Sequence, residues 1–382
     1  MNPQTIMIVA GDPSGDAIAA DLARALAAAL PGARFIGAGG PKMAAAGVAT
    51  SFDLTADAVI GLSDVARLLP RFFRHKRQLA QLAAEHKPAL IVLVDFEFFN
   101  RFLARAIRRR VAPDWQPRIV KYVSPQVWAS RPGRAAKMAR DFDLLLCLFP
   151  FEKDWYARRA PALRVEFVGH PMFDRYPEPV RKPSQVPTVL LLPGSRRAEL
   201  KRHLPVMAGA ARLIAAQHMV RFKLVAPTEE KASQARAFLA GAGSEIEIQI
   251  GRLEEALSEA TVAIASTGTV TLECAFFGVP TVALYKTSLW TYLIGRQIVT
   301  VDYLSMPNIL ANEPLFPEFI QGQATASNIA GAALELLANP ARRAETQSKL
   351  ARVISTLGGA GAAQRAAAAI LRLASQGELS KT

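Results

Sequence analysis

Short apolar runs alternate with helix-length amphipathic segments along most of this chain. The run "TIMIVA" (5–10) predicts a buried strand, and apolar residues at four-residue intervals within 17–30 predict one face of a helix. Further apolar runs predict strands at 89–95, 118–124, 143–149 and 165–169. Strands that alternate with helices are typical of βαβ units, so the first half predicts a parallel, doubly wound α/β sheet.

A proline-rich stretch interrupts this rhythm. "DRYPEPVRKPSQVP" (174–187) has no hydrophobic periodicity and predicts an interdomain linker. Beyond it the alternation resumes, with strands predicted at 188–196, 222–227, 246–250, 261–266 and 281–285. We therefore expect two α/β domains, 1–175 and 188–357, that face each other across a cleft, with an Ala-rich helix within 358–382 packed on the first domain. Ligands of such sheets bind at the carboxyl ends of the strands.

Length, charge and composition limit the possible classes of function but do not identify one. A chain of 382 residues predicts two domains rather than one core. The formal charge of +14 favours anionic partners: nucleic acid, anionic lipid or a phosphorylated substrate. Cys147 and Cys274 lie in apolar segments and are expected to be buried, reduced thiols. We expect no signal peptide and no spanning segment, because the first residues carry no basic region and no run reaches the roughly 18–20 apolar residues required.

The first turn, "AGDPSGD" (10–16), argues against a nicotinamide cofactor. It lacks G-x-G-x-x-G, and Asp12 and Asp16 would repel a pyrophosphate. Ser14 suits an N-cap and Asp16 suits the positive end of the helix. The alternative is that Ser14, Gly15 and Asp16 form a small wall against which a sugar binds. We expect no cofactor, and the five histidines show no zinc-ligand spacing, so no metal site is expected either.

A stronger candidate for a ligand site is "LLLPGSRRAEL" (190–200). Gly194 allows backbone N–H groups to approach a phosphate, Ser195 adds a hydroxyl donor and Arg196 adds a bidentate cation. A solvated turn is the alternative interpretation.

The segment "ASTGTVTLECAFFGVP" (265–280) repeats this arrangement. Thr267, Gly268 and Thr269 form a small loop before a helix, and Glu273 follows Thr269 by one turn. The loop suits a diphosphate, and the carboxylate suits the ribose hydroxyls. The alternative makes Thr269 an N-cap and pairs Glu273 with a surface cation. Two phosphate-suited loops in the second domain predict that it binds an activated nucleotide donor and that the first domain binds the acceptor.

A basic and aromatic segment, "VIGLSDVARLLPRFFRHKRQLAQL" (59–82), suits an anionic membrane surface. Its membrane candidates are Leu68, Leu69, Phe72 and Phe73 together with Arg71, Arg74, Lys76 and Arg77. A core helix with a solvated basic face is the alternative. We expect no nucleic-acid partner, because no helix-turn-helix, zinc-finger or RRM signature is present.

Nearly end to end, these blocks resemble the lipid A disaccharide synthases, a family of inverting glycosyltransferases. The blocks are "AGDPSGD" (10–16), "GAGGPKMAAAG" (37–47), "YVSPQVWASR" (122–131), "LFPFEKDWY" (148–156), "FVGHPMFD" (167–174), "LLPGSRRAEL" (191–200), "TGTVTLE" (267–273) and "VDYLSMPNILANEPLFPEFIQ" (301–321). The resemblance implies the GT-B fold of two Rossmann-like domains. It also implies transfer of the sugar of UDP-2,3-diacylglucosamine to 2,3-diacylglucosamine 1-phosphate (lipid X), which gives a β-1,6 disaccharide and UDP. The implied location is cytoplasmic, peripheral on the inner face of the inner membrane; a homo-oligomer is left open.

The resemblance also implies residue roles. Asp95 matches the family's candidate general base, and Arg196 matches the arginine near the diphosphate. Asn308, Glu318 and Gln321 match polar positions on the donor side. The acceptor side would be formed by Ser14, Gly15, Asp16, Asn100 and Ser124. The phenylalanines beside Asp95 would raise its pKa by desolvation; core packing with Asp95 as a helix cap is the alternative.

The block around Asp95 departs from the family pattern. The family reads Asp-Ala-Pro-Asp-Phe-Asn or close to it, whereas residues 95–100 read Asp-Phe-Glu-Phe-Phe-Asn. The blocks on the donor side match the family pattern better than the blocks on the acceptor side do. Three alternatives therefore stand beside the lipid A reaction: a transferase for another acylated sugar, a GT-B UDP-sugar epimerase or hydrolase, and a catalytically silent binding protein.

Overall fold

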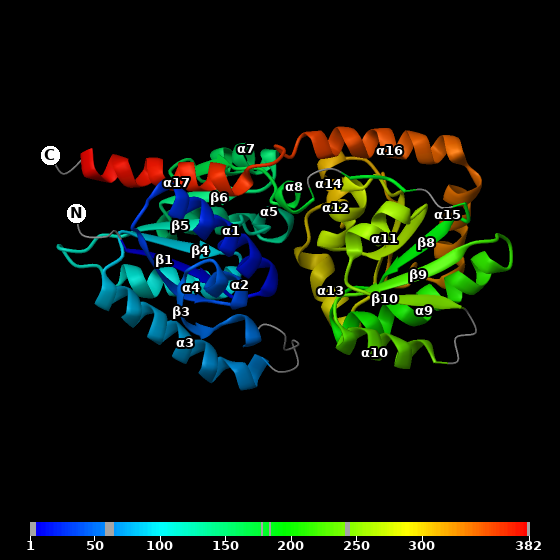
Figure 1. Ribbon diagram of the computed structural model, residues 1–382, viewed down its shortest axis with the longest axis horizontal. Helices are drawn as coiled ribbons and strands as arrows, with labels where there is room; N and C mark the ends of the chain where they lie inside the picture. The colour runs from blue at the N-terminus through cyan, green and yellow to red at the C-terminus, as the bar shows by residue number, and fades with distance from the viewer. Residues whose placement is uncertain (1–4, 58–64, 177–178, 183–184, 241–244, 380–382) are drawn as a thin grey trace. The chain divides into compact units, whose positions relative to one another are not determined.

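The structure is a computed structural model that describes the chain except residues 1–4, 58–64, 177–178, 183–184, 241–244 and 380–382, and except the side chains of 57–69 and 376–382. Its internal contacts divide the chain into two compact units (Figure 1). Unit 1 contains Met1–Arg175 and Leu357–Thr382, and unit 2 contains Tyr176–Thr356. Each unit is built around its own parallel sheet, as the alternation of apolar runs predicts.

Unit 1 holds a seven-stranded sheet in the order β3-β2-β1-β4-β5-β6-β7, with every pair parallel. The strands are β1 (Thr5–Ala10), β2 (Arg34–Gly39), β3 (Ala49–Asp53), β4 (Leu90–Val94), β5 (Arg118–Tyr122), β6 (Leu144–Cys147) and β7 (Arg164–Phe167). The central strands β1 and β4 are almost wholly buried, which is why they read as continuous apolar runs.

Helices cover both faces of this sheet (Figure 1). On one face α3 (Val65–His86), α4 (Glu97–Arg108) and α6 (Ala135–Asp141) enclose the main core, and on the other α1 (Pro13–Ala29) packs against α17 (Ala362–Leu379). The remaining helices of the unit are α2 (Pro41–Ala45), α5 (Val127–Ser130), α7 (Pro150–Arg159) and α8 (Met172–Arg175), with 3-10 turns at Thr55–Asp57 and Pro132–Arg134.

Unit 2 holds a six-stranded parallel sheet in the order β10-β9-β8-β11-β12-β13. The strands are β8 (Thr188–Leu192), β9 (Arg221–Ala226), β10 (Ile246–Ile250), β11 (Val262–Ser266), β12 (Thr281–Tyr285) and β13 (Glu318–Ile320). The helices are α9 (Arg197–Ala215), α10 (Glu229–Leu239), α11 (Leu253–Glu259), α12 (Thr269–Phe276), α13 (Leu289–Ile298), α14 (Met306–Ala311), α15 (Ala326–Ala338) and α16 (Pro340–Ser355). The core lies between the sheet and helices α9 and α15.

The two parallel α/β sheets confirm the predicted fold class, with local differences. Hydrophobic pattern alone did not identify β2, β3 or β13. The edge strand β3 has no buried residue and β13 spans three residues, so neither produces an apolar run. Within the predicted linker, Asp174 and Arg175 instead end helix α8. In the described part of the chain, no helix combines the length and apolarity needed to cross a bilayer.

Candidate functional site

Each sheet has a topological switch point, and the predicted ligand loops lie beside it. In unit 1 the strand order reverses between β1 and β4, so the turns that begin at Gly11 and at Asp95 flank that point. In unit 2 it reverses between β8 and β11, so the Pro193–Arg196 loop and the Thr267–Thr269 loop flank it. Open α/β sheets bind ligands where neighbouring connections leave toward opposite faces. The topology thus brings the two predicted phosphate loops to one location within unit 2.

The first turn of unit 1 is capped by Asp12, not by Ser14 as the sequence suggested. The Asp12 carboxylate accepts hydrogen bonds from the Gly15 N–H at 2.8 Å and the Ser14 hydroxyl at 2.6 Å. Ser14 lies in the first turn of α1 and is exposed. Asp16 is buried and accepts from three backbone amides at the start of α2, those of Gly40, Lys42 and Met43. Asp16 therefore ties α1 to α2, which is a structural role.

Asp95 directly follows β4 in a strained turn. Its φ is 44° and that of Phe96 is 42°, so two consecutive non-glycine residues adopt the left-handed conformation. On the neighbouring strand end, the β-branched residue Val123 has φ 68°. Such residues cost on the order of 1–3 kcal/mol each and persist where surrounding contacts fix them. The α1 turn is close, because a Cβ atom built on Gly15 would lie 3.4 Å from the Cβ of Asp95.

Asn100 and Lys121 are the contacts that fix this turn. The Asn100 Nδ2 donates to the backbone oxygens of Val94 (3.0 Å) and Asp95 (2.8 Å), and the Lys121 ammonium donates to the same Asp95 oxygen. Both side chains are buried. Asn100 was predicted on the acceptor side through the family pattern, whereas Lys121 was missed. Its only sequence signal is a lysine within the apolar run of a central strand.

Two opposing effects act on the pKa of the Asp95 carboxyl. Burial raises the pKa of the Asp95 carboxyl above its ordinary value, and the Lys121 cation lowers it, while the neighbouring Asp12 carboxylate raises it. For Lys121, burial lowers the pKa to about 8 against the attraction of nearby carboxylates. The predicted upward shift of the Asp95 pKa therefore has desolvation as its largest cause.

Ser124 lies deeper than a ligand-facing residue. It is buried, and its hydroxyl lies 3.3 Å from the Tyr156 hydroxyl. Beside it, the buried Glu152 accepts from the Trp128 indole N–H at 2.9 Å and from the Phe149 N–H at 3.1 Å, and burial raises the pKa of Glu152 to about 7. This cluster packs the end of β5 against α7.

The first ligand loop of unit 2 is a capped helix start with an exposed cation. Gly194 has φ 100°, and a Cβ atom on it would meet the Glu199 carboxylate at 2.2 Å, so glycine is required there. Glu199 accepts from the Arg196 N–H at 3.1 Å. The Arg196 side chain is 82% exposed and lies 3.3 Å from Glu199. With Ser195 also exposed, the loop presents both predicted side chains to solvent.

In the second ligand loop, Gly268 and not Thr269 is the N-cap of α12. Thr267 is half-buried, and Gly268 and Thr269 are exposed at the helix N-terminus. Glu273 lies one turn into the helix, as predicted from its spacing, and accepts from the Tyr176 hydroxyl at 3.3 Å. The first N–H groups of a helix lack partners within the helix, which is the feature on which anion binding at an N-terminus depends.

Of the three remaining donor-side residues, Gln321 joins the ends of β12 and β13, and Asn308 and Glu318 organise the backbone that precedes β13. Glu318 accepts from the N–H groups of Leu304 and Ser305 and from the Asn308 amide at 2.8 Å. The buried Asn308 also exchanges two hydrogen bonds with the backbone of Phe316. Asn308 and Glu318 thus hold the α14 segment in place. Because Asn308 is fully buried, it does not face a ligand directly.

A buried histidine that the sequence reasoning did not assign connects two parts of unit 2. His203 Nδ1 lies 2.8 Å from the Pro193 carbonyl, and its Nε2 accepts from the Lys286 N–H at 3.1 Å. Because a carbonyl only accepts, Nδ1 carries the proton and the ring is neutral, in agreement with a pKa lowered by burial. His203 therefore fixes the first ligand loop relative to the end of β12.

The predicted membrane segment forms part of an exposed aromatic cluster. Phe72 of α3 contacts Phe73, Phe98 and Phe102, with ring centroids 5.6–6.0 Å apart. Phe73 and Phe98 are 52% and 62% exposed. We call these four residues the phenylalanine patch. Arg71, Arg74 and Arg77 are exposed on α3, and the Lys76 ammonium lies over the Phe73 ring. The side chains of Leu68 and Leu69 lie outside the described residues.

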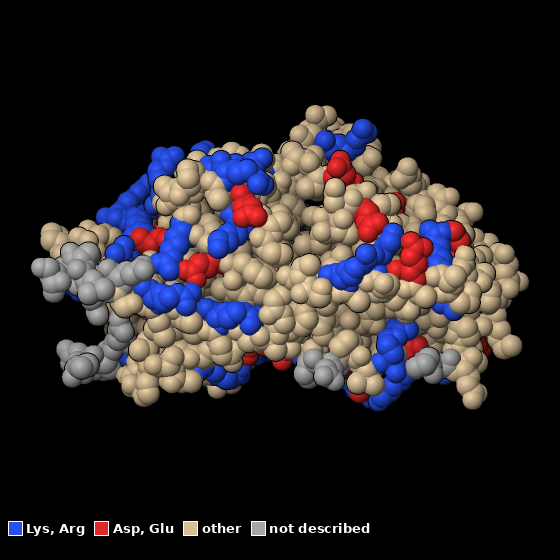
Figure 2. Space-filling model, turned by 90° about the horizontal axis from the view of Figure 1, so that it is seen from above, with Lys and Arg blue, Asp and Glu red and all other residues tan. Residues whose placement is uncertain are grey.

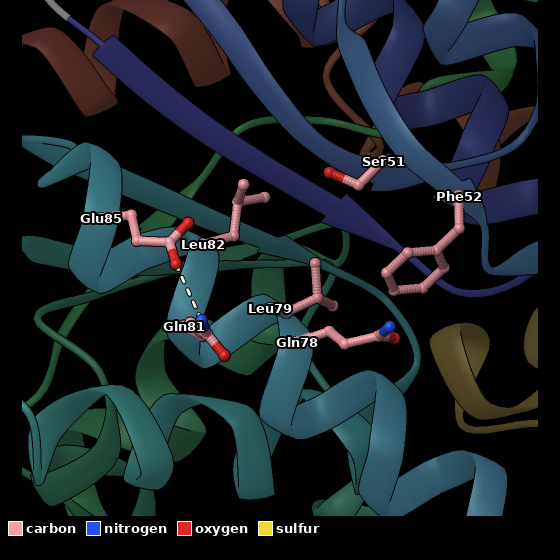
Figure 3. Close-up of a pocket in the computed structure, with 7 residues that line it drawn as sticks. All are labelled: Ser51, Phe52, Gln78, Leu79, Gln81, Leu82 and Glu85. Carbon is pink, nitrogen blue, oxygen red and sulfur yellow. Dashed lines mark hydrogen bonds between the residues drawn. The ribbon is translucent and has the colours of Figure 1, made fainter.

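A separate pocket of about 310 Å³ lies between β3 and α3 (Figure 3). Its lining residues are Ser51, Phe52, Gln78, Leu79, Gln81, Leu82 and Glu85. Gln81 and Glu85 hydrogen-bond each other at 2.8 Å across one helical turn. None of the predicted site residues lines this pocket, so it does not form part of the candidate site.

Comparison with known proteins identifies relatives of the whole chain. The family model described as "Lipid-A-disaccharide synthetase" matches residues 6–373. The lipid-A-disaccharide synthase of Myxococcus xanthus is 35% identical over 99% of this chain and 100% of its own length. That of Syntrophus aciditrophicus is 36% identical over 98% of each.

Solved structures share the fold at low sequence identity. A UDP-GlcNAc 2-epimerase from Neisseria meningitidis, bound to UDP-GlcNAc, has a TM-score of 0.63 with 11% identity and covers 97% of this chain and all of its own. MurG from Acinetobacter baumannii has a TM-score of 0.56 with 15% identity over 97% of this chain and all of its own. These likenesses confirm the predicted GT-B architecture of two α/β sheets.

Proposed function

Because this chain belongs to the lipid-A-disaccharide synthetase family and is therefore a glycosyltransferase of lipid A biosynthesis, we propose that its donor is UDP-2,3-diacylglucosamine and its acceptor is 2,3-diacylglucosamine 1-phosphate. In this proposal unit 2 binds the donor and unit 1 binds the acceptor. The products are UDP and a β-1,6-linked disaccharide that carries the acceptor's 1-phosphate.

The donor assignment rests on the loops at the switch point of unit 2. The exposed Arg196 side chain and the N-terminus of α12 would neutralise the diphosphate. Glu273, on the face of α12 one turn beyond Thr269, would accept hydrogen bonds from the ribose hydroxyls. Arg196 would then stabilise the charge that develops on the leaving diphosphate.

The acceptor assignment rests on Asp95. In the proposed step, the 6-hydroxyl oxygen of the acceptor attacks the anomeric carbon of the donor while the bond from that carbon to the diphosphate oxygen breaks. The hydroxyl proton moves to the Asp95 carboxylate, and the diphosphate leaves with the electron pair of the broken bond. An acid with a pKa raised by burial is a stronger base near neutral pH than an ordinary aspartate.

One observation carries this proposal above the others: the residues matched to the base and to the diphosphate site each lie at the switch point of their own sheet. The test is transfer from radiolabelled UDP-2,3-diacylglucosamine to lipid X, with linkage analysis of the product. Asp95→Asn should lower kcat by at least about 10²-fold, as loss of a general base does. Asp154→Asn, which removes an exposed carboxylate from α7, is the control. Normal turnover in Asp95→Asn would eliminate Asp95 as the base.

Family membership argues for a transferase, and the epimerase or hydrolase alternative can be tested directly. The two functions differ in their need for an acceptor. A transferase releases UDP only when lipid acceptor is present, whereas turnover of the donor in water alone would favour an epimerase or hydrolase.

We further propose that the phenylalanine patch of unit 1 binds an anionic bilayer. Each phenylalanine that enters the acyl boundary contributes about 1.5–3 kcal/mol, and cations beside the patch add attraction to anionic lipid. Cationic character is not confined to α3, since Lys and Arg side chains also gather on the left part of the face shown in Figure 2. The patch extends the predicted membrane segment, because Phe98 and Phe102 come from α4.

Vesicle sedimentation tests this surface. Wild-type protein should bind phosphatidylglycerol-containing vesicles, and more weakly as salt rises. Phe73→Ser with Phe98→Ser should weaken binding, whereas Met219→Ser, which removes an 82% exposed apolar side chain from unit 2, should not. Equal binding by all three proteins would contradict the proposal.

A further inference from the structure

Lys121 occupies a position where a parallel sheet normally places an apolar side chain. In the strand register it lies beside Leu93 of β4 and Leu145 of β6, and Leu93 in turn lies beside Val9 of β1. Residues in register point to the same face of a sheet. Val9, Leu93 and Leu145 belong to the core under α3, α4 and α6, and Lys121 is only 1% exposed. The lysine thus interrupts an otherwise apolar row.

The acceptor of this ammonium is the turn that carries Asp95. Among the described residues, the hydrogen-bond acceptor found for Lys121 Nζ is the backbone oxygen of Asp95, which also accepts from Asn100. A buried ammonium is costly unless it is compensated by a hydrogen bond and by opposite charge. The hydrogen bond and the strongest attraction from an opposite charge that stabilise the buried Lys121 ammonium both come from Asp95, the residue proposed as the base.

The charges around Lys121 come from three connections. Asp95 lies in the turn after β4, Glu97 lies at the start of α4, and Asp12 lies in the turn after β1, and all three attract the ammonium. On the side of α6, Arg134 lies 3.5 Å from Glu97 and offsets part of that charge. Three carboxylates thus attract one buried cation, and two of them, Asp12 and Asp95, lie in the turns at the switch point of unit 1.

We propose that Lys121 is a positioning residue that acts through Asp95. Its ammonium holds the left-handed turn through the Asp95 carbonyl, and its charge keeps the buried carboxylate in the ionised form that can accept a proton. This inference rests on the proposed role of Asp95 as the base. Lys121 itself does not contact substrate, because its side chain is enclosed by the core.

The geometry explains why a lysine suits this position. From β5 a long, flexible side chain reaches the end of the neighbouring strand, and its charged end remains beneath the turn. Methionine has similar length and no charge, so Lys121→Met removes the hydrogen bond and the charge while it retains most of the volume.

The test measures ionisation apart from catalysis. In full-length protein labelled with 13C at aspartate carboxyls, the Asp95 resonance is identified by its loss in Asp95→Asn. The Asp95 titration should move to higher pH in Lys121→Met, and kcat/KM on the acid limb of the pH profile should fall roughly tenfold, because an attractive cation is lost. Lys137→Met removes an exposed lysine of α6 and should change neither.

Two results would overturn the inference. One is an unchanged Asp95 titration in folded Lys121→Met. If that variant does not fold, the wild-type protein decides: because the Lys121 ammonium donates to the Asp95 carbonyl, the Asp95 resonance should show a second inflection as Lys121 loses its proton, at a pH below the ordinary pKa of lysine. Its absence would overturn the inference. Normal activity of Asp95→Asn would instead overturn the base assignment, whatever the titration shows.

Discussion

Phe96 lies against Gly11, so closely that no side chain fits between them. A Cβ atom built on Gly11 would lie 2.0 Å from Cδ1 and 2.5 Å from Cγ of the Phe96 ring. The ring also stacks on Phe99, with centroids 5.4 Å apart. The glycine of the first turn therefore accommodates the Phe96 ring.

Gly11→Ala should therefore disturb the turn that holds Asp95. The ring must move, and it is attached to a residue in the left-handed conformation next to the proposed base. We expect kcat to fall at least about tenfold, with a loss of about 1–3 kcal/mol in the free energy of unfolding. Activity assays and urea titration measure both.

A second substitution distinguishes a local clash from general damage. Phe96→Ala removes the ring, so the double variant Gly11→Ala/Phe96→Ala should recover much of the lost activity. Gly133→Ala is the matched control, because nothing lies within 4 Å of a Cβ at Gly133. A double variant no better than Gly11→Ala would argue against the clash.

Gln321 joins the ends of two strands in unit 2. Its Oε1 accepts from the Thr287 N–H and its Nε2 donates to the Thr287 oxygen, both at 3.0 Å, while its backbone oxygen accepts from Lys286 Nζ. Gln321→Met removes both side-chain bonds and should cost about 1–2 kcal/mol of stability. If the segment helps to bind the donor, KM for the UDP-sugar should rise more than kcat falls. Asn328→Ala, at the exposed start of α15, is the control.

Arg196→Ala should lower turnover by about 10²-fold, because it removes the cation proposed to stabilise the leaving diphosphate. Its hydrogen-bonded partner Glu199 retains its bond to the backbone N–H of residue 196, so the helix start should survive. Arg197→Ala removes the adjacent exposed cation and should have little effect. A near-normal rate for Arg196→Ala would contradict its role.

The sequence predicts the features that local patterns determine, and it does not predict contacts between residues far apart in the chain. Apolar runs and turn residues predicted the parallel sheets and the loops at 194–196 and 267–269, because strand ends and glycines are local signals. The N-cap predicted at Ser14 was wrong, and so was the alternative that placed one at Thr269, since Asp12 and Gly268 compete with neighbours of similar propensity and the choice depends on the three-dimensional turn. Lys121 and His203 were missed because their partners lie 26 residues away at Asp95 and 83 residues away at Lys286, and no local pattern encodes such pairings.

Arg365 fastens the last helix to unit 1. Its guanidinium donates to the carbonyl oxygens of Val168 (2.7 Å), Gly359 (2.9 Å) and Ala360 (2.6 Å). Arg365→Met should lower the free energy of unfolding by about 2–4 kcal/mol, because three carbonyls lose a charged donor. Gln364→Ala, on the exposed face of α17, should change it little. Equal stability of the two variants in urea titration would contradict this role.

His170 makes the stability of unit 1 depend on pH. Burial, with a smaller effect from Arg175, lowers the pKa of its imidazole to about 4, and Nδ1 accepts from the Met172 N–H at 3.2 Å. In the unfolded chain a histidine titrates near pH 6.5. Between these values the unfolded state binds more protons, so the contribution of the neutral His170 to stability is complete above about pH 6.5 and is lost as pH falls toward 4.

An NMR titration of the His170 ring should therefore have its midpoint near 4. In His170→Asn the pH dependence of the free energy of unfolding should weaken in this window, whereas His86→Asn, at an exposed site on α3, should retain it. A His170 midpoint above pH 6 would contradict the mechanism, because protonation would then carry no penalty in the folded state.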